Sequence, residues 1–457
     1  MESQQTAVQQ PTPSRWFQAL DLAAMFKSGG FRLSLKNAAF GICEYLSQPV
    51  FMFIATPFLV ARLGLEQFGL WMLVSALSGT VGVLNLSVGD ATIKYVSFFR
   101  GQKNEARMVR AINASLMLSL LLGGASAIAI YASAPLLALH VFKVSLFNQP
   151  LAVASIRAGS FILFLKSIDG VFASGLRAFE RYALSSSAAM TVRLLTTVCA
   201  IILTAAGKNV FMILVATAGA TVLGLLMQAV ALKRLVRSLR IRLTIDREAM
   251  SEICSFGIYS WVQGIAGVLF MHADRLVIAA LLSTSALTYY TVCLQLTQPI
   301  HGVIWAAFGF LFPHISARQH STSNAAIRRV YRLSLAVGLS AAMFFTMILL
   351  VFGNRILTVW MGPAFAQQSH RVLLALAIAF AMLALNVVPY FTLLGLGRVR
   401  FVAAINLFGG LLSLVLASAL IPFLGLVGAA LGRIVYGPIT WVTFRKVRLL
   451  LTTDARS

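Results

Sequence analysis

Long apolar stretches follow one another along almost the whole chain, separated by short polar connections. The hydrocarbon core of a bilayer is about 30 Å thick, and a helix of about 20 apolar residues spans it. Because backbone polar groups in lipid must be satisfied internally, each stretch predicts a transmembrane helix. Twelve are predicted, at residues 37–61, 69–97, 111–138, 152–176, 183–206, 209–232, 253–282, 285–315, 333–353, 372–396, 402–421 and 424–444.

The composition supports this pattern. Hydrophobic residues make up 59% of the 457 residues, charged residues make up 11%, and the mean hydropathy is +0.87. A soluble domain of this size needs far more polar surface. The predicted fold class is therefore an all-α integral membrane protein.

Basic residues are distributed unequally over the connections. Of the 37 lysines and arginines, 26 lie in the N-terminal segment, in every second connection or in the C-terminal tail, and only five lie in the other connections. The positive-inside rule therefore predicts that both termini are cytoplasmic. The net charge of +24 is explained by this topology and by contact with anionic lipid headgroups, so no nucleic-acid partner is expected.

The two halves of the chain show an internal repeat. Phe40-Gly41-Ile42 opens the first predicted helix and Phe256-Gly257-Ile258 opens the seventh, so each half contains six helices. An even number makes the repeat parallel, related by an axis along the membrane normal. The predicted divisions are an N-terminal cytoplasmic segment, a six-helix bundle, a basic linker, a second six-helix bundle and a basic tail, at residues 1–36, 37–232, 233–252, 253–444 and 445–457.

The start of the chain does not resemble a cleavable signal peptide, because the first apolar run begins near Asn37 and is too long for one. The stretch Trp16–Phe26 fits either an interfacial helix or a disordered tail. The cysteines show no spacing typical of metal sites, so they are interpreted as packing residues, and no metal or cofactor is expected.

The chain resembles the Wzx-type oligosaccharide flippases of the multidrug, oligosaccharidyl-lipid and polysaccharide exporter superfamily. The residues that carry the resemblance are Ala61-Arg-Leu-Gly-Leu-Glu-Gln-Phe-Gly-Leu-Trp71, Ala273-Asp-Arg-Leu-Val-Ile278 and the arginine-rich second and eighth connections. The turn at 283–290 lacks the glycines of the first turn and departs from the pattern.

The resemblance implies transfer of a polyprenyl-pyrophosphate-linked oligosaccharide from the cytoplasmic to the periplasmic leaflet of the bacterial inner membrane. The products would be surface polysaccharide, exopolysaccharide or lipopolysaccharide. The resemblance also implies work alongside a polysaccharide polymerase and a chain-length regulator.

Ionisable residues within transmembrane helices cost roughly 3 kcal/mol each on insertion scales, and they usually face a cavity or a partner. Here they are confined to a subset of the predicted helices, which predicts a polar lumen lined by those helices. They are the acids Glu44, Asp90, Asp169 and Asp274, the bases Lys94, Arg157, Lys166, Arg193, Arg275 and Arg433, and His272.

The spacing of these residues along each helix indicates which of them can pair and which are expected in the lumen. Asp90 and Lys94 are four apart and fit a pair along one helix face, although Lys94 also fits extension toward the cytoplasmic interface. Lys166 and Asp169 lie near the middle of their helix, where such extension is harder, and are expected in the lumen. Arg157 lies nine residues before Lys166, so it points to the opposite side of that helix.

The remaining charges need partners from elsewhere. Arg193 and Arg433 have no acidic neighbour within their own helices, so each requires either a residue from another helix or an anionic ligand. Asp274 and Arg275 project about 100° apart and are expected at the site. His272 fits either a proton carrier or a packing residue.

Six basic residues face four acids within the predicted helices, and arginine grips phosphate bidentately. This balance favours an anionic substrate carried by alternating access. The candidates for substrate binding are Arg193, Arg433, Arg275, Lys166, Arg157, Gln295 and Gln298. The candidates for coupling or structural charge are Glu44, Asp90, Lys94, Asp169, His272 and Asp274.

Two other functions make different demands on the sequence. A cation-coupled multidrug exporter of the same fold would tolerate loss of Arg193 or Arg433. A membrane-embedded enzyme would need a catalytic constellation, and none is recognisable in the sequence. The sequence also lacks a GxxxxGK[ST] loop, so direct use of ATP is not expected.

Overall fold

The computed structural model describes residues 29–241, 250–251, 253, 264–265, 267–318 and 324–453, and every regular element in these ranges is helical. The all-helical prediction is therefore confirmed. The main helices are α2 (Gly29–Gly101), α3 (Glu105–Leu136), α4 (Gln149–Ala178), α5 (Tyr182–Ala205), α6 (Val210–Leu235), α8 (Asp274–Leu281), α9 (Thr284–Phe308), α10 (Leu311–Arg318), α11 (Asn324–Met361), α12 (Pro363–Leu385), α13 (Val387–Gly395), α14 (Val399–Gly432) and α15 (Tyr436–Thr453).

Eight helical segments within the described ranges are long and apolar enough to cross a membrane. Helices α2 and α14 each contain one residue outside the helical conformation. In α2 it is Gly64, with a φ of 78°, and in α14 it is Gly425, with a φ of 55°. Gly64 lies between the first and second predicted helices, and Gly425 lies at the start of the twelfth. Glycine suits both positions because it adopts positive φ without a steric penalty.

Several sequence predictions fall outside the described residues. These are the interpretation of Trp16–Phe26, part of the 233–252 linker, the first part of the helix predicted at 253–282 and the last residues of the tail. The helix predicted at 372–396 is broken in the structure: α12 ends at Leu385 and α13 begins at Val387, two residues before Pro389. Proline lacks the N–H that would continue the hydrogen-bond ladder.

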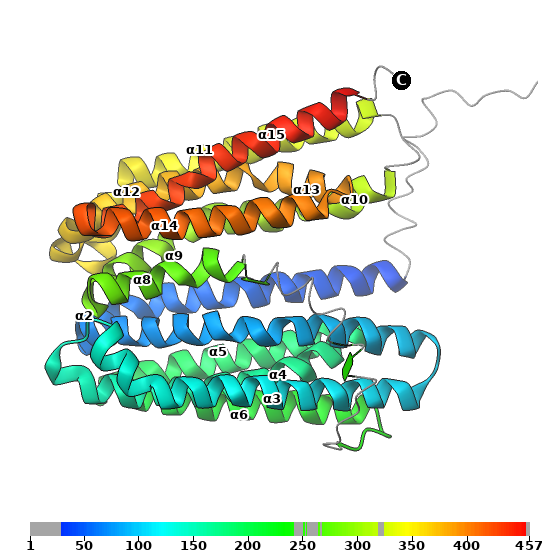
Figure 1. Cartoon of the computed structure of the whole chain (residues 1–457), viewed down its shortest axis with the longest axis horizontal. Helices are drawn as coiled ribbons and strands as arrows, with labels where there is room; N and C mark the ends of the chain where they lie inside the picture. Colours follow the sequence, from blue (N-terminus) through cyan, green and yellow to red (C-terminus); the bar gives the residue numbers. More distant parts are fainter. Residues whose placement is uncertain are drawn as a thin grey trace, which may run out of the picture.

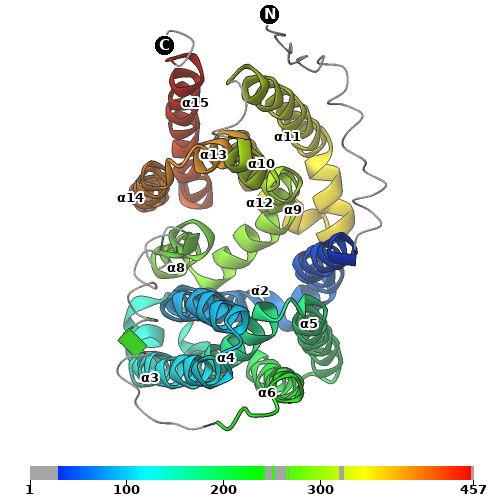
Figure 2. The ribbon, with the colours of Figure 1, turned by 90° about the vertical axis from the view of Figure 1, so that its right-hand side faces the viewer.

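The helices lie in two groups (Figures 1 and 2). The N-terminal group contains α2–α6, and the C-terminal group contains α9–α15, with α8 beside α9. We call one end of the molecule the Gly64 end, because it holds the bend at Gly64 and the turns near Gly207, Gly362 and Gly425. The opposite end holds the turns near Lys103, Glu180 and Gly397 and is called the Gly397 end.

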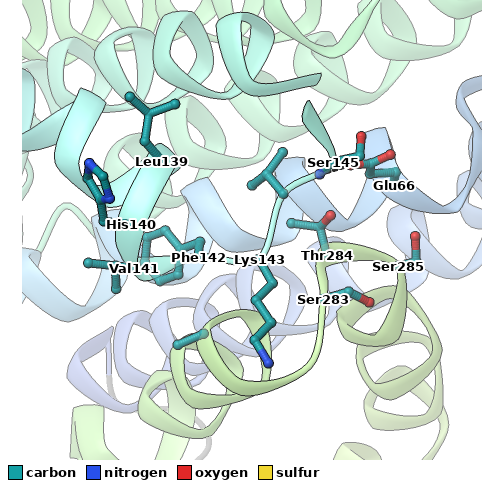
Figure 3. Close-up of a pocket in the computed structure, with 12 residues that line it drawn as sticks. Glu66, Leu139, His140, Val141, Phe142, Lys143, Ser145, Ser283, Thr284 and Ser285 are labelled. Atoms are coloured by element: carbon teal, nitrogen blue, oxygen red, sulfur yellow. Dashed lines mark hydrogen bonds between the residues drawn. The ribbon is translucent and has the colours of Figure 1, made fainter. Parts of the chain in front are cut away.

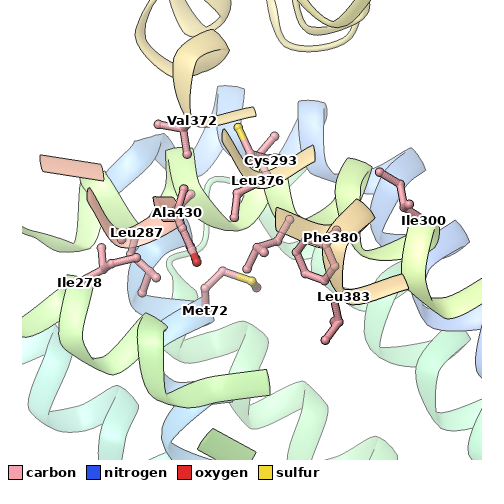
Figure 4. Packing of buried hydrophobic residues seen from close by; sticks show 14 of the residues in the cluster. Met72, Ile278, Leu287, Cys293, Ile300, Val372, Leu376, Phe380, Leu383 and Ala430 are labelled. Carbon is pink, nitrogen blue, oxygen red and sulfur yellow. The ribbon is translucent and has the colours of Figure 1, made fainter. Parts of the chain in front are cut away.

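Buried apolar residues show where the two groups pack. One large cluster joins both groups; it includes Met72 of α2, Ile278 of α8, Leu287 of α9 and Phe380 of α12 (Figure 4). A second cluster lies within the N-terminal group, toward the Gly397 end, and includes Phe99. The groups therefore share a core in the half of the molecule nearer the Gly64 end.

Hydrogen bonds between the groups lie in the same half. Thr288 Oγ1 donates to the carbonyl of Leu65 at 2.6 Å, and Lys143 N donates to the carbonyl of Ala279 at 2.9 Å. At Gly69, an added Cβ would lie 1.8 Å from the carbonyl oxygen of Thr284. Only glycine permits this close approach of α2 to α9.

Candidate functional site

A carboxylate of the N-terminal group lies between two arginines from neighbouring helices. Glu44 comes from α2, Arg177 from the end of α4 and Arg193 from the middle of α5. Glu44 Oε1 is 3.4 Å from Arg177 Nη2 and 3.9 Å from Arg193 Nη2. Ser186 of α5 donates its hydroxyl to Glu44 Oε2 at 2.7 Å. We call these residues, with Ser47, the Glu44 cluster.

Arg193 also contacts α2 through its other terminal nitrogen. Arg193 Nη1 donates to Ser47 Oγ at 2.9 Å and to the backbone carbonyl of Glu44. The structure thus gives Arg193 a partner from another helix. Arg177 was not among the sequence candidates, because it falls one residue beyond the helix predicted at 152–176.

The C-terminal group holds a tighter cluster. Arg433 Nη2 donates to Asp274 Oδ2 at 2.7 Å, and Tyr290 donates its hydroxyl to the same oxygen at 2.5 Å. Arg433 also lies over the ring of Phe380, 5.2 Å from its centroid. The Asp274 and Arg433 side chains are only 8% and 5% exposed. We call Asp274, Tyr290 and Arg433 the Asp274 cluster.

Asp274 and Arg433 were both candidates from the sequence, but no sequence pattern pairs them. Tyr290 was not a candidate, because a tyrosine in an apolar helix gives no signal of the carboxylate to which it donates. Arg275, beside Asp274, is half-buried, and its Nε is shielded from solvent without a hydrogen-bond partner.

Lys166 lies between the two groups. Its side chain is exposed although it stands near the middle of α4. It interacts electrostatically with Arg193 of α5, with Asp169 one turn further along α4, and with His272 of the C-terminal group. A cationic side chain that is accessible at this depth, with neighbours in both groups, indicates a polar space between them.

Two of these neighbours are held by contacts of their own. Asp169 Oδ1 accepts a hydrogen bond from Gln228 of α6 at 2.7 Å. The ring of His272 lies against Gly79 of α2, where an added Cβ would come within 2.7 Å of it. His272 therefore packs across the junction of the two groups.

The other candidates lie elsewhere. Arg157 lies over the ring of Tyr131 of α3, 4.8 Å from its centroid, and this tyrosine is 53% exposed. Asp90 and Lys94 are exposed on α2, with the Lys94 ammonium 5.1 Å from the ring centroid of Tyr95.

Gln295 and Gln298 differ in their contacts. Gln295 Oε1 accepts a hydrogen bond from Thr56 of α2 at 3.0 Å, so it joins the two groups. Gln298 Nε2 lies 3.9 Å from the sulfur of Met271.

A pocket of about 510 Å³ lies at the Gly64 end (Figure 3). Residues of both groups line it, and Lys143 Nζ donates to the carbonyl of Leu281 at 2.7 Å. Glu66 accepts hydrogen bonds from Ser145 N at 2.8 Å and from Asn148 Nδ2 at 2.7 Å. None of these residues was a sequence candidate.

The accessible basic side chains, such as Lys166 and Arg193, can therefore attract an anion, whereas the described residues form no metal site. Within the described ranges, no group of three or more His, Cys, Asp or Glu side chains is placed to hold a metal ion. The accessible charges are mainly cationic, and arginine and lysine bind phosphate oxygens.

Residues 96–370, more than half of the chain, match the model of a family described as "Polysaccharide biosynthesis protein". A protein of Shigella flexneri named "Putative O-antigen transporter" is 21% identical over 405 residues, covering 87% of this chain and 93% of that protein. The "Uncharacterized membrane protein EpsK" of Bacillus subtilis is 25% identical over 398 residues, covering 80% of this chain and 76% of that protein.

Among solved structures, an inward-facing conformation of a multidrug resistance MATE family transporter of the MOP superfamily superposes with a TM-score of 0.79. The superposition covers 91% of this chain and 99% of that one, at 16% sequence identity. The fold is therefore MATE-like. The Shigella flexneri protein and the superposed structure are both named as transporters.

Proposed function

Because the chain belongs to the polysaccharide biosynthesis protein family, we propose that it is a flippase for a polyprenyl-pyrophosphate-linked oligosaccharide. It moves this substrate from the cytoplasmic to the periplasmic leaflet for surface polysaccharide or lipopolysaccharide biosynthesis. The observation that carries the proposal is the position of Lys166, accessible near mid-helix and within electrostatic range of residues of both helix groups.

The proposed topology has twelve transmembrane helices in two six-helix bundles related by a parallel repeat, in a bacterial inner membrane. The Gly397 end carries basic residues such as Arg100, Lys103 and Arg398, so the positive-inside rule makes it cytoplasmic. Both termini then lie in the cytoplasm, and the Gly64 end faces the periplasm.

The proposed mechanism is alternating access. The shared core and the hydrogen bonds at the Gly64 end close the periplasmic side, while the cationic residues are reached from the cytoplasmic side. Lys166, Arg193 and Arg275 attract the pyrophosphate, and the lipid tail stays in the bilayer. Reorientation must break contacts such as Thr288–Leu65 and Lys143–Ala279.

A second function, cation-coupled export of drugs, is favoured by one observation: the MATE-like fold. Exporters of organic cations need available carboxylates. Here Glu44 and Asp274 contact arginines and Asp169 contacts Gln228. These contacts support the flippase over the exporter.

The test uses a deletion strain. Lipids are extracted, and polyprenyl-pyrophosphate-linked oligosaccharide is measured together with surface polysaccharide. The flippase hypothesis expects accumulated intermediate and lost polymer, both restored by the wild-type gene but not by Arg193→Ala at a normal protein level. Unchanged lipids with altered drug sensitivity would favour the exporter.

The same strain tests the proposed partners. A polysaccharide polymerase and a chain-length regulator act on the flipped product, so both should remain at normal levels when the flippase is deleted. Polymer should return when the flippase alone is restored.

A further inference from the structure

The Glu44 cluster has more donor capacity than its carboxylate uses. Two arginines face one glutamate, so the cluster carries a net positive charge. Their distances to Glu44, 3.4 and 3.9 Å, exceed the roughly 2.7–2.9 Å typical of charge-assisted hydrogen bonds. Arg177 Nε is shielded from solvent and donates to nothing in the structure. A guanidinium has five N–H donors, and this one leaves a donor without an acceptor.

The cluster is also accessible. The side chains of Arg177, Arg193 and Glu44 are 33%, 30% and 17% exposed. Glu44 lies twenty residues before the bend at Gly64, and Arg177 lies at the end of α4, so the cluster belongs to the half of the molecule nearer the Gly397 end. In that half the described residues of the two helix groups share no buried core. Figure 2 shows the start of α2 beside α5 at the edge of the N-terminal group.

We propose that the Glu44 cluster is a diphosphate-binding site in which Glu44 is an internal stand-in for the ligand. This inference rests on the proposed function and assigns one step of it to named atoms. The diphosphate of the incoming lipid displaces the Glu44 carboxylate and accepts hydrogen bonds from Arg177, Arg193 and the Ser186 hydroxyl.

The chemistry of the two anions supports the exchange. A diphosphate offers several acceptor oxygens and at least two negative charges, and it binds arginine bidentately, whereas the carboxylate offers two oxygens at long range. The Ser186 hydroxyl that now donates to Glu44 can donate equally to phosphate. When the diphosphate leaves, Glu44 returns, so the two guanidinium groups do not face each other without an anion.

This exchange predicts which substitutions strengthen diphosphate binding and which weaken it. The free energy of diphosphate binding at the cluster is reduced by the free energy of the Glu44 contacts that the diphosphate displaces. Removal of the carboxylate should therefore strengthen diphosphate binding, while removal of an arginine should weaken it. A cluster that is merely structural would be damaged by either change.

The test measures binding of tritiated farnesyl diphosphate to the purified full chain in nanodiscs of phosphatidylcholine. Glu44→Gln should bind about tenfold more tightly, equivalent to about 1.4 kcal/mol, and Arg193→Gln at least tenfold more weakly. Glu44→Asp keeps the charge on a shorter side chain and should fall between wild type and Glu44→Gln.

The matched controls are Glu180→Gln and Arg100→Gln. Their salt bridge joins α2 to the turn after α4 in the same group, at 3.0 Å, but is exposed. Both controls should bind like wild type. Weaker binding by Glu44→Gln, or an affinity equal to that of Glu180→Gln, would overturn the inference.

Two further arms identify the source of the anion. Competition by inorganic pyrophosphate supports a site that recognises the diphosphate itself. If phosphatidylglycerol in the nanodisc abolishes the difference between Glu44→Gln and wild type, the site binds bilayer headgroups and the inference fails. The proposed function fails separately, if the deletion strain accumulates no lipid-linked oligosaccharide.

Discussion

The Glu44 cluster and the Asp274 cluster use the same residue types but differ in distance and access. In the Asp274 cluster an arginine nitrogen lies 2.7 Å from the carboxylate, and both side chains are at most 8% exposed. In the Glu44 cluster the closest such distance is 3.4 Å, and both arginines are about one-third exposed. The first is buried and has short contacts, and the second has longer contacts and an open side.

This difference separates two residues that look alike in the sequence. Arg193 and Arg433 each lack an acidic neighbour in their own helix, and both were candidates for binding substrate. A buried ion pair is strongly destabilised when one partner is removed, because the other charge stays buried. An accessible pair contributes little to stability. We expect Arg433 to govern folding and Arg193 to govern transport.

The largest expected effect comes from Arg433→Met. It leaves the Asp274 carboxylate buried without its charged partner, with the Tyr290 hydroxyl and the Arg275 backbone N–H as donors, so the folded state should lose about 3–5 kcal/mol. The measurement is thermal unfolding of the purified protein, together with its amount in the membrane. Arg193→Met should unfold near the wild-type temperature.

A double variant sharpens this prediction. Arg433→Met combined with Asp274→Leu removes both charges, so it should recover much of the lost stability. If Arg433→Met alone unfolds like wild type while transport is lost, Arg433 acts on the substrate, and the contrast between the clusters disappears.

A smaller loss of stability is expected for Tyr290→Phe. The change removes the hydroxyl that donates to Asp274 at 2.5 Å, while Arg433 remains bonded. Leaving a buried acceptor with one fewer donor costs about 1–3 kcal/mol. The readout is again thermal unfolding. Tyr289→Phe is the control, because Tyr289 packs its ring against Phe365, and its variant should be stable. Equal melting temperatures for the two variants would contradict the role of the Tyr290 hydroxyl.

An effect of similar size is expected for Lys166→Met, on transport and not on stability. A hydrogen bond to a charged group is worth about 1.5–3 kcal/mol, so the loss of one contact to the pyrophosphate should slow flipping by at least tenfold. Lipid-linked oligosaccharide in the deletion strain reports the rate. The protein level should stay normal, because Lys166 is exposed. Lys103→Met, in an exposed turn, is the control. If the Lys166→Met variant exports polymer at the wild-type level, Lys166 does not contact the substrate.

The all-helical class was predictable because it depends on long-range averages of hydropathy. The bend at Gly64 follows from the short polar turn between two apolar runs, and the helical class follows from the runs themselves. The break at Asn386 was not predicted as a boundary, because the flanking residues are apolar on both sides and only Pro389 marks it.

The partners within the site were less predictable. Glu44 meets Arg193 across 149 residues of sequence, and Asp274 meets Arg433 across 159. Spacing within one helix identifies charges that need a partner, but the choice of partner depends on how helices pack. For the same reason, the contacts of Lys143 and Glu66 could not be predicted. Lys143 bonds to α8, and Glu66 of α2 bonds to the connection before α4, so both depend on how that connection packs.

The smallest expected effect concerns the Gly64 end, where Lys143→Met removes the hydrogen bond from Nζ to the carbonyl of Leu281. The backbone bond from Lys143 N to the carbonyl of Ala279 remains, and an exposed hydrogen bond contributes only about 0.5–1.5 kcal/mol, so opening at this end should become a few times more frequent. The reporter is Thr284→Cys, at a position that is 1% exposed, labelled by a membrane-impermeant maleimide in a background without other cysteines. Labelling should accelerate about twofold to fivefold with Lys143→Met and should not change with Lys208→Met, a control in another connection at the same end. Slower or unchanged labelling would mean that the apolar core around Met72 and Leu287, and not the Lys143 contact, sets the rate at which this side opens.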